Sequence, residues 1–290
     1  MGPMSGRGHH HGTNVIVERY DRDADRYGHH WAPVLDASAR RLLERVAAEV
    51  RLPAAPVILD VGTGTGVLAF EALRRWPAAT VIATDASSGM LVQAKAATAA
   101  AGLEGDPRLG WAHRPADALG EPDASVDVVI SSFVYQLVPD RAAALAEALR
   151  VLRPGGALAF VTWLDRGDDY RPSVEFDEAV YDSEIDEVDP PEGEQHRAGD
   201  FRSASTAAKE LRAAGFKNVA ARPERLSWTW TPETYLAFKQ AYEEDQLFAA
   251  LSAADAARLV ARAQERWAAL PAAAWTWRAE LVSAIGRCPR

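Results

Sequence analysis

Three glycines at alternating positions follow directly on an apolar run. The stretch "LDVGTGTGVLAF", residues 59–70, contains Gly62, Gly64 and Gly66, and Asp60 precedes them. Glycine adopts positive φ angles and lets a ligand approach the backbone closely. A helix that starts directly after these glycines also offers free N–H groups to an anionic ligand. The spacing therefore predicts a ligand-binding turn between a strand and a helix.

A dinucleotide is one class of ligand that binds at such a turn. A dinucleotide site requires the spacing G-x-G-x-x-G, whereas this chain has G-x-G-x-G. This difference in glycine spacing argues against a reductase that uses a nicotinamide cofactor. A tight turn without any ligand is the simplest alternative.

The turn resembles the first motif of class I S-adenosylmethionine-dependent methyltransferases, and the resemblance continues along the chain. Asp85 ends the next apolar run, 19 positions after Gly66. "PADAL", residues 115–119, resembles the family's Asp-Ala after the third strand. "DASVDVVISSFVYQLVPD", with Phe133 near its ligand-facing end, resembles the fourth-strand motif, and "LRVLRPGGALAFVTW" resembles the fifth strand with its preceding turn. These motifs follow one another in the family's order over residues 57–163.

The resemblance implies S-adenosyl-L-methionine as the cofactor and assigns roles to single residues. Asp85 would accept hydrogen bonds from both ribose hydroxyls, and Asp117 from the adenine amino group. "YDRDADRY", residues 20–27, resembles the family's N-terminal lid pattern Y-D-x-x-A-x-x-Y, although aromatic residues at this spacing also pack in cores. The implied cofactor-binding residues are Asp60, Gly62, Thr63, Gly64, Gly66, Asp85, Ala86, Met90, Asp117, Ala118, Ser131 and Tyr27.

The implied activity is methyl transfer to a small-molecule acceptor by in-line displacement, which leaves S-adenosylhomocysteine, as in quinone or natural-product methyltransferases. Two alternatives stay open. The chain could bind the donor without methyl transfer, as a cyclase or a binding partner, or it could methylate tRNA or protein. A tRNA or protein acceptor would favour a groove lined with Lys and Arg, and the acidic residues 165–200 show none.

The pattern identifies no catalytic base. The candidates are His196 and Tyr135, with His113 and the pair His29/His30 as further possibilities. The ordinary pKa of histidine suits proton removal near neutral pH, but a solvated loop residue is the simpler interpretation of His196. Some members of the family have histidines where "YQL", residues 135–137, stands here, so the catalytic residue is unknown.

The chain order of apolar runs and amphipathic patterns predicts an α/β fold, with a Rossmann-like seven-stranded, mostly parallel sheet and helices on both faces. Five strands are expected at "VILDV", "TVIATD", "LGWAHRP", "VDVVISS" and "ALAFVTW". "RPGG", residues 153–156, predicts a turn before the fifth strand. "NVAARPERLSWTW" and "AWTWRAELVSAIGRC" predict two further strands.

Five segments follow from these elements. We expect a disordered start or tag remnant at residues 1–13, N-terminal cap helices at 14–52, the methyltransferase core at 53–230, a helical addition before the last strand at 231–270, and the last core strand with the C-terminus at 271–290. The addition should form two helices, and residues 165–200 a surface loop with one short helix. Aromatic residues around the addition either roof an apolar acceptor pocket or pack as core; they are Trp228, Trp230, Tyr235, Phe238, Tyr242 and Phe248.

The composition restricts the kinds of partner that the protein is expected to bind. A net charge of −9 over 290 residues disfavours nucleic acid, because that binding rests on Lys and Arg at phosphates. No apolar stretch approaches the ~20 residues of a membrane-spanning helix, and the single cysteine, Cys288, rules out an internal disulfide. No Cys/His cluster has the spacing of metal ligands. We expect a cytoplasmic bacterial protein with no membrane partner, and exposed aromatic residues would permit a homodimer.

Overall fold

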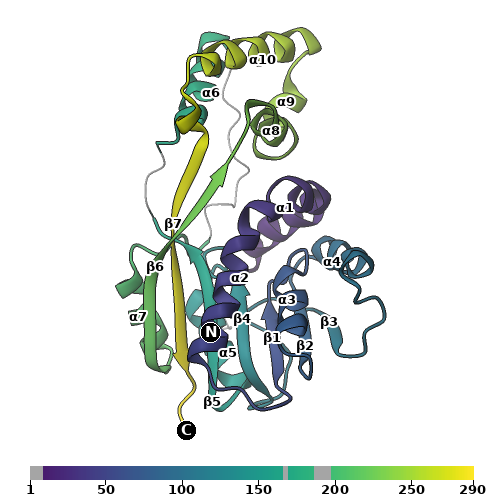
Figure 1. Ribbon diagram of the computed structural model, residues 1–290, viewed down its shortest axis with the longest axis vertical. Coiled ribbons are helices and arrows are strands. Elements are labelled where there is room, and N and C mark those ends of the chain that lie inside the picture. Colours follow the sequence, from purple (N-terminus) through teal and green to yellow (C-terminus); the bar gives the residue numbers. More distant parts are fainter. Residues whose placement is uncertain (1–8, 166–168, 186–196) are drawn as a thin grey trace, which may run out of the picture.

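A mixed sheet of seven strands forms the centre of the fold (Figure 1). The computed structural model describes residues 9–165, 169–185 and 197–290, with side chains from residue 15. The strand order is β3 (Leu109–His113), β2 (Thr80–Asp85), β1 (Val57–Val61), β4 (Val126–Ser132), β5 (Leu152–Trp163), β7 (Thr276–Arg287) and β6 (Lys217–Thr229). The first five are parallel, and β7 runs antiparallel to β5 and β6. The predicted fold class is confirmed.

Helices cover both faces of this sheet, and two apolar clusters fill the space beneath them. Alternate residues of β1 point to opposite faces, so that Ile58 belongs to one cluster and Leu59 to the other. The first face carries α2 (Ala32–Glu49), α3 (Val67–Arg75) and α4 (Ser88–Ala101); the second carries α5 (Arg141–Val151) and α7 (Ala204–Ala213). None of the helices in the described ranges is long and apolar enough to cross a bilayer.

The strand order reverses beside β1, which has β2 on one side and β4 on the other. In open parallel sheets, ligands bind beyond the carboxyl ends of the strands at such a reversal. The loops that follow β1, β2 and β4 therefore meet at one edge. The helix α1 (His9–His30) packs against α4 beside these loops.

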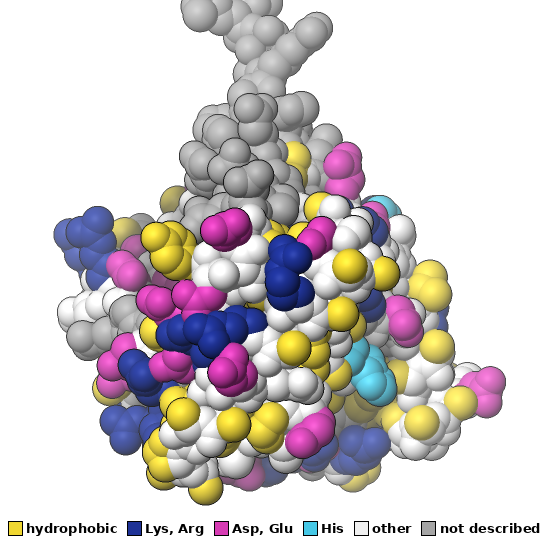
Figure 2. Space-filling view, turned by 90° about the horizontal axis from the view of Figure 1, so that it is seen from above, with side chains coloured by type: hydrophobic (Ala, Val, Ile, Leu, Met, Phe, Trp, Pro, Cys, Tyr) yellow, Lys and Arg dark blue, Asp and Glu magenta, His cyan; other side chains and the backbone are white. Residues whose placement is uncertain are grey.

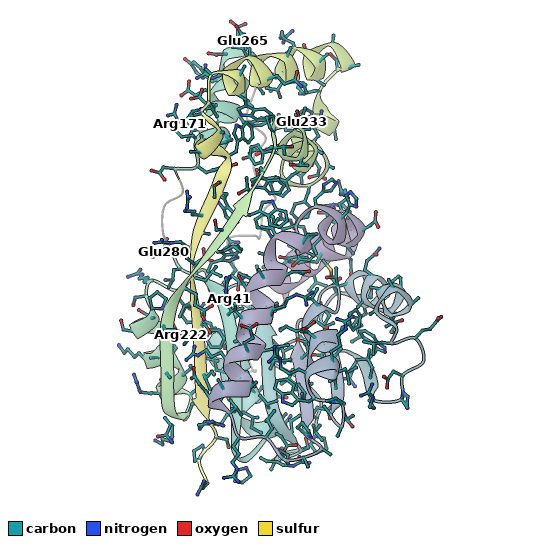
Figure 3. The ribbon with its side chains drawn as sticks, in the orientation of Figure 1. Arg41, Arg171, Arg222, Glu233, Glu265 and Glu280 are labelled. Atoms are coloured by element: carbon teal, nitrogen blue, oxygen red, sulfur yellow. The ribbon has the colours of Figure 1, made fainter. Side chains whose placement is uncertain are left out.

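Helices inserted around β6 and β7 form a cap above the sheet (Figure 1). The strands β6 and β7 continue beyond the sheet as a two-stranded ribbon, and Figure 3 shows Arg41 and Arg222 near its core end and Arg171 and Glu265 in the cap. The cap elements are α6 (Arg171–Asp182), α8 (Pro232–Phe238), the π-helix η1 (Lys239–Glu243), α9 (Asp245–Ala250), α10 (Ala253–Ala268) and the 3-10 helix η2 (Ala272–Trp275).

Two local predictions were wrong. "RPGG" is not a turn: β5 already begins at Leu152, and its register with β4 shifts here while Gly155 adopts φ +82°. The first helix of the addition is not continuous either, because α8 ends at Phe238 and a π-turn follows. Lys239, which is 2% exposed, starts that turn and pairs with carboxylates on the same segment. The short helix expected within residues 165–200 is α6, which packs on α10.

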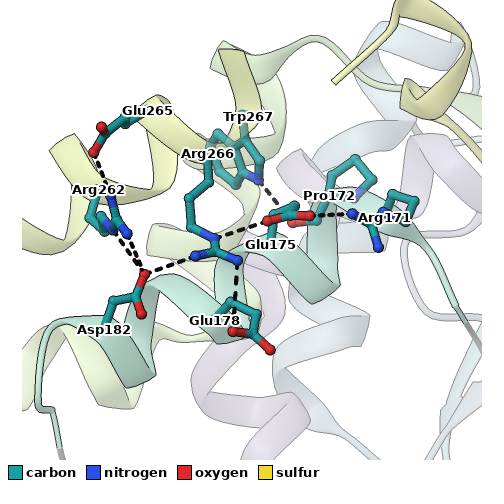
Figure 4. A network of polar contacts seen from close by, with 9 residues as sticks. All are labelled: Arg171, Pro172, Glu175, Glu178, Asp182, Arg262, Glu265, Arg266 and Trp267. Carbon is teal, nitrogen blue, oxygen red and sulfur yellow. Dashed lines mark hydrogen bonds and ion pairs between the residues drawn. The ribbon is translucent and has the colours of Figure 1, made fainter. Parts of the chain in front are cut away.

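An ion-pair network joins α6 to α10 (Figure 4). The Arg266 guanidinium donates to Glu175 at 2.9 Å and to Asp182 at 2.8 Å, and lies 3.7 Å from Glu178. Arg262 also donates to Asp182, at 2.7 Å. Seen from above, basic and acidic side chains are interspersed on this face of the molecule (Figure 2).

Arg266→Ala is expected to lower the thermal unfolding midpoint more than Arg262→Ala. The Arg266 side chain is 23% exposed and has three carboxylate neighbours, whereas that of Arg262 is 38% exposed with two. A network of partly buried charges contributes on the order of 1 kcal/mol, more than a single exposed pair. Unfolding scans at low and high salt measure the difference, which salt should reduce. An equal effect of both variants would contradict the prediction.

Candidate functional site

The predicted glycine turn lies between β1 and α3. Gly62, Gly64 and Gly66 have φ angles of +67°, +55° and +89°, a region that L side chains rarely adopt. Thr63 N donates to Thr84 O at 2.8 Å, which ties the turn to β2. A Cβ atom on Gly62 would lie 2.2 Å from a methyl carbon of Val134. Backbone conformation and close packing both explain the glycine there.

A cavity opens over this turn; we call it the glycine-turn cavity. It is lined by residues from the loops after β1, β2, β3 and β4 and from α1. Of the predicted cofactor-binding residues, those that line it are Tyr27, Gly62, Gly64, Asp85, Ala86, Met90 and Asp117. Tyr20 of the lid pattern and Phe133 of the fourth-strand motif also line it, as do Ile16, Arg114 and Leu137, to which the motifs assigned no role. The structure thus brings seven of the predicted residues to one cavity.

The other predicted cofactor-binding residues do not line the cavity; they are Asp60, Thr63, Gly66, Ala118 and Ser131. Several of these residues stabilise the walls of the cavity through hydrogen bonds. Ser131 is fully buried and its hydroxyl donates to Val61 O at 2.8 Å, which links β4 to β1. Thr63 Oγ1 donates to Asp60 Oδ2 at 2.7 Å beneath the turn.

The Asp85 carboxylate is fixed between two backbone segments. Its Oδ2 accepts from Gly64 N and its Oδ1 from Ser87 N, both at 2.8 Å. Burial raises the pKa of Asp85, and these two hydrogen bonds act in the opposite direction. The arrangement holds a hydrogen-bond acceptor against the cavity at the carboxyl end of β2.

Asp60 lies fully buried beneath the turn, and its Oδ1 has no hydrogen-bond partner. Burial raises the pKa of Asp60 to about 7; the nearby Asp85 adds to the rise and the Thr63 hydroxyl opposes it. The folded state therefore holds this proton more tightly than the unfolded chain does.

This proton should make stability depend on pH. Because the pKa of Asp60 is raised in the folded state, its contribution is complete below the ordinary value of 3.8 and is lost as pH rises to about 7. Asp60→Asn should remove that part of the pH dependence. The check is the urea unfolding midpoint of both proteins at pH values of about 5 and 8. Parallel declines in the two proteins would show that Asp60 titrates normally.

The helix α1 covers the glycine-turn cavity and is anchored to the start of α4. Asp21 Oδ1 accepts from Gly89 N and from Ser87 Oγ, both at 2.7 Å. A Cβ atom on Gly89 would lie 2.7 Å from Asp21 O, so only glycine permits this approach. Tyr27 packs edge-on against Tyr20, and both line the cavity. The helix thus has the position that the lid prediction requires.

A second cavity lies between the core and the cap; we call it the aromatic cavity. Its aromatic walls are Tyr20, Trp31, Trp163, Phe238, Tyr242 and Trp277. Ile16, Tyr20 and Leu137 line both cavities, so the two spaces adjoin. Of the aromatic set predicted around the helical addition, Phe238 and Tyr242 line this cavity. Trp230 and Tyr235 instead pack in the core of the cap.

Among the described residues, none of the candidate bases lines the aromatic cavity. His196 lies outside the described residues. Tyr135 is 1% exposed and packs on Phe160 beneath the other face of the sheet, and burial raises the pKa of its phenol. His113 Nε2 lies 2.7 Å from Ala86 O at the end of β3. His29 and His30 contact each other near the end of α1.

Comparison with known proteins agrees with this geometry. Residues 58–156 match a family model described as a methyltransferase domain. The chain is 38% identical over 122 residues to trans-aconitate 2-methyltransferase of an Azoarcus species, covering 42% of this chain and 43% of that protein. It is 44% identical over 105 residues to the ubiquinone/menaquinone biosynthesis C-methyltransferase of Dinoroseobacter shibae, covering 36% and 41%. The chain thus spans less than half the length of these relatives.

Among solved structures, the 4+2 cyclase SpnF is similar with a TM-score of 0.58 and 20% identity, over 96% of each chain. At this identity the similarity shows a shared fold. The family match covers β1 to the start of β5, which includes the glycine turn, Asp85 and Asp117. Residues 58–156 therefore form a methyltransferase domain, and its motifs resemble those of class I S-adenosylmethionine-dependent methyltransferases.

Proposed function

We propose that the protein binds S-adenosyl-L-methionine in the glycine-turn cavity and transfers its methyl group to a small molecule in the aromatic cavity. The proposal depends above all on the position of Asp85. Its carboxylate lines the cavity beside the glycine turn, where it would accept hydrogen bonds from both ribose hydroxyls. Asp117, across the same cavity, would accept from the adenine amino group.

The two adjoining cavities suit an in-line displacement. The donor methyl group would face the acceptor near Ile16, Tyr20 and Leu137, which line both spaces. The protein's own contribution is to hold the two reactants in line and to exclude water. The apolar residues at this junction and the α1 helix above it support both tasks.

Isothermal titration with S-adenosylmethionine and with S-adenosylhomocysteine tests the proposal, and NADH is the control. We expect the first two ligands to bind with micromolar affinity and NADH to produce no heat. Binding of NADH, or failure of both sulfur compounds to bind, would overturn the proposal.

Donor binding without methyl transfer is the second candidate function. The similarity to the cyclase SpnF over nearly the whole chain supports it, because this fold is then not restricted to transferases. Incubation with S-adenosylmethionine and a panel of acceptors separates the two candidates. Accumulation of S-adenosylhomocysteine that requires an acceptor indicates transfer, whereas donor that binds and stays intact with every acceptor favours the second candidate.

We further propose that the acceptor is neither nucleic acid nor protein. The aromatic cavity lies between core and cap, and the chain carries a net charge of −9. Trans-aconitate 2-methyltransferase and the ubiquinone/menaquinone C-methyltransferase, whose names give small molecules, support this assignment. Both relatives are bacterial, which supports a bacterial origin, while cytoplasmic location and a homodimer stay predictions.

A further inference from the structure

Asp200 lines the aromatic cavity, and the segment that carries it is attached to the loop after β4. Ala198 N donates to Val138 O, and Gly199 N donates to Gln136 O, both at 3.0 Å. These two backbone hydrogen bonds set the segment beside the loop as a short strand would. The position of Asp200 is therefore determined by the core.

The loop that holds Asp200 is also where the two cavities meet. Gln136 lines the aromatic cavity, Val138 lines the glycine-turn cavity, and Leu137 between them lines both. Asp200 therefore lies on the acceptor side of the junction at which methyl transfer would take place.

Arg141 and β5 also hold the segment that carries Asp200. Arg141 Nη1 donates to Gly199 O at 2.7 Å, and its guanidinium lies 3.9 Å from the centre of the Phe201 ring. Phe201 N donates to Trp163 O at 3.2 Å. These contacts fix the backbone on both sides of Asp200, and a fixed backbone limits where its side chain can lie, which suits proton transfer to a positioned group.

Asp200 is the carboxylate of this cavity that is available to a ligand. Among the described lining residues the carboxylates are Asp200 and Glu243, and Glu243 lies 2.6 Å from the buried Lys239 ammonium. The Asp200 carboxylate makes no hydrogen bond to any described residue.

The charged groups around Asp200 come from several elements. Partial burial raises the pKa of its carboxyl; Arg197 acts against that rise, Asp165 adds to it and Arg141 lowers it. Arg197 itself lines the cavity, as do Glu243 from η1 and Arg19 from α1. A raised pKa makes the Asp200 carboxylate a stronger base than an exposed aspartate.

The aromatic walls indicate the shape of the acceptor. The ring centres of Trp31, Trp163 and Trp277 are 5.6 to 6.2 Å apart, and Trp31 stacks on Phe238 at 5.3 Å. Rings this close contact one another, so they form a wall and leave no space between them for a cation. Such a wall favours a flat ring that stacks on it.

We propose that the acceptor is a flat aromatic compound with a hydroxyl or amine group, and that Asp200 is the catalytic base that takes its proton. This inference rests on the proposed function. In the step, the lone pair of the oxygen or nitrogen forms a bond to the methyl carbon, and the carbon–sulfur bond breaks with its electron pair remaining on sulfur. The proton of the hydroxyl or amine moves to the Asp200 carboxylate.

The test uses 4-nitrophenol as the probe, because its phenolate absorbs visible light and its phenol does not. In the wild-type protein, the Asp200 carboxylate beside the hydroxyl should disfavour the phenolate, so the bound probe should ionise at a higher pH than it does in a protein without this charge. Asp200→Asn removes the like charge and should lower the ionisation pH of the bound probe by about one unit. Asp165→Asn removes a neighbouring carboxylate that does not line the cavity, and it should lower the ionisation pH of the bound probe much less than Asp200→Asn does.

Identical ionisation of the probe in the wild type and in Asp200→Asn would overturn the assignment of Asp200. Failure of 4-nitrophenol to bind the wild type would overturn the assigned acceptor class. The probe titration needs no methyl donor, so its result is separate from the donor titrations. Loss of donor binding in those titrations overturns the proposed function, whatever the probe does.

Discussion

Asp85→Ala is expected to weaken S-adenosylmethionine binding about 5- to 150-fold, which corresponds to on the order of 1–3 kcal/mol for lost charge-assisted hydrogen bonds. The carboxylate lines the glycine-turn cavity and is fixed by Gly64 N and Ser87 N. The substitution removes the acceptor for the ribose hydroxyls and also releases both backbone donors. Isothermal titration of the folded variant measures the loss.

Two further variants separate the role of Asp85 from general effects of charge or folding. Asp85→Asn keeps one carbonyl acceptor and should fall between wild type and Asp85→Ala. Asp123→Ala removes a carboxylate that is 80% exposed and lines neither cavity, so donor affinity should not change. If a folded Asp85→Ala protein binds S-adenosylmethionine with unchanged affinity, Asp85 does not bind the ribose hydroxyls.

Gly62→Ala should be the most disruptive single methyl addition at the turn. The positive φ of +67° costs about 1–2 kcal/mol for an L residue. The new Cβ would lie 2.2 Å from a Val134 methyl carbon, and such overpacking costs about 1–3 kcal/mol more. Val134 lines the glycine-turn cavity, so its displacement should also weaken donor binding. Urea unfolding and donor titration measure the two effects.

The chain offers a matched control and a rescue for this variant. Gly105 has a φ of +69° and nothing within 4 Å of its Cβ position, so Gly105→Ala should lose only the backbone contribution. In Gly62→Ala combined with Val134→Ala, the clashing methyl groups are absent and the overpacking part of the loss should be recovered. If Gly62→Ala costs no more than Gly105→Ala, close packing is not what requires glycine at position 62.

Local patterns were sufficient to predict the core. Each of the first four strands lies in an apolar run bounded by turn residues, and β4 covers the predicted "VDVVISS" from end to end. Asp85 was identifiable because its position relative to the glycine turn depends on one strand and one helix. Residues that brace the turn, such as Ser131, belong to the same motifs, and the sequence alone does not show whether their side chains face the cavity.

The aromatic cavity could not be predicted in the same way, because contacts distant along the chain determine it. Trp31, Trp163 and Trp277 come from three separate segments and meet only after the sheet and cap have formed. Asp200 carries no motif, and its placement depends on backbone pairing with residues 136–138. Asp21 was visible within the "YDRDADRY" pattern, but its role at the start of α4 was not.

The ribbon of β6 and β7 separates the two halves of the active centre along the chain. Apart from Ile16, Val17 and Tyr20 of α1, the glycine-turn cavity is built from residues 27–139, while Phe238, Tyr242 and Glu243 of the aromatic cavity come from helices inserted between β6 and β7. On the proposed function, substitutions in this insertion should therefore alter acceptor choice while the donor site is retained. Such a fold would diversify its substrates by exchanging one module, and grafting a related cap onto this ribbon should then change acceptor specificity.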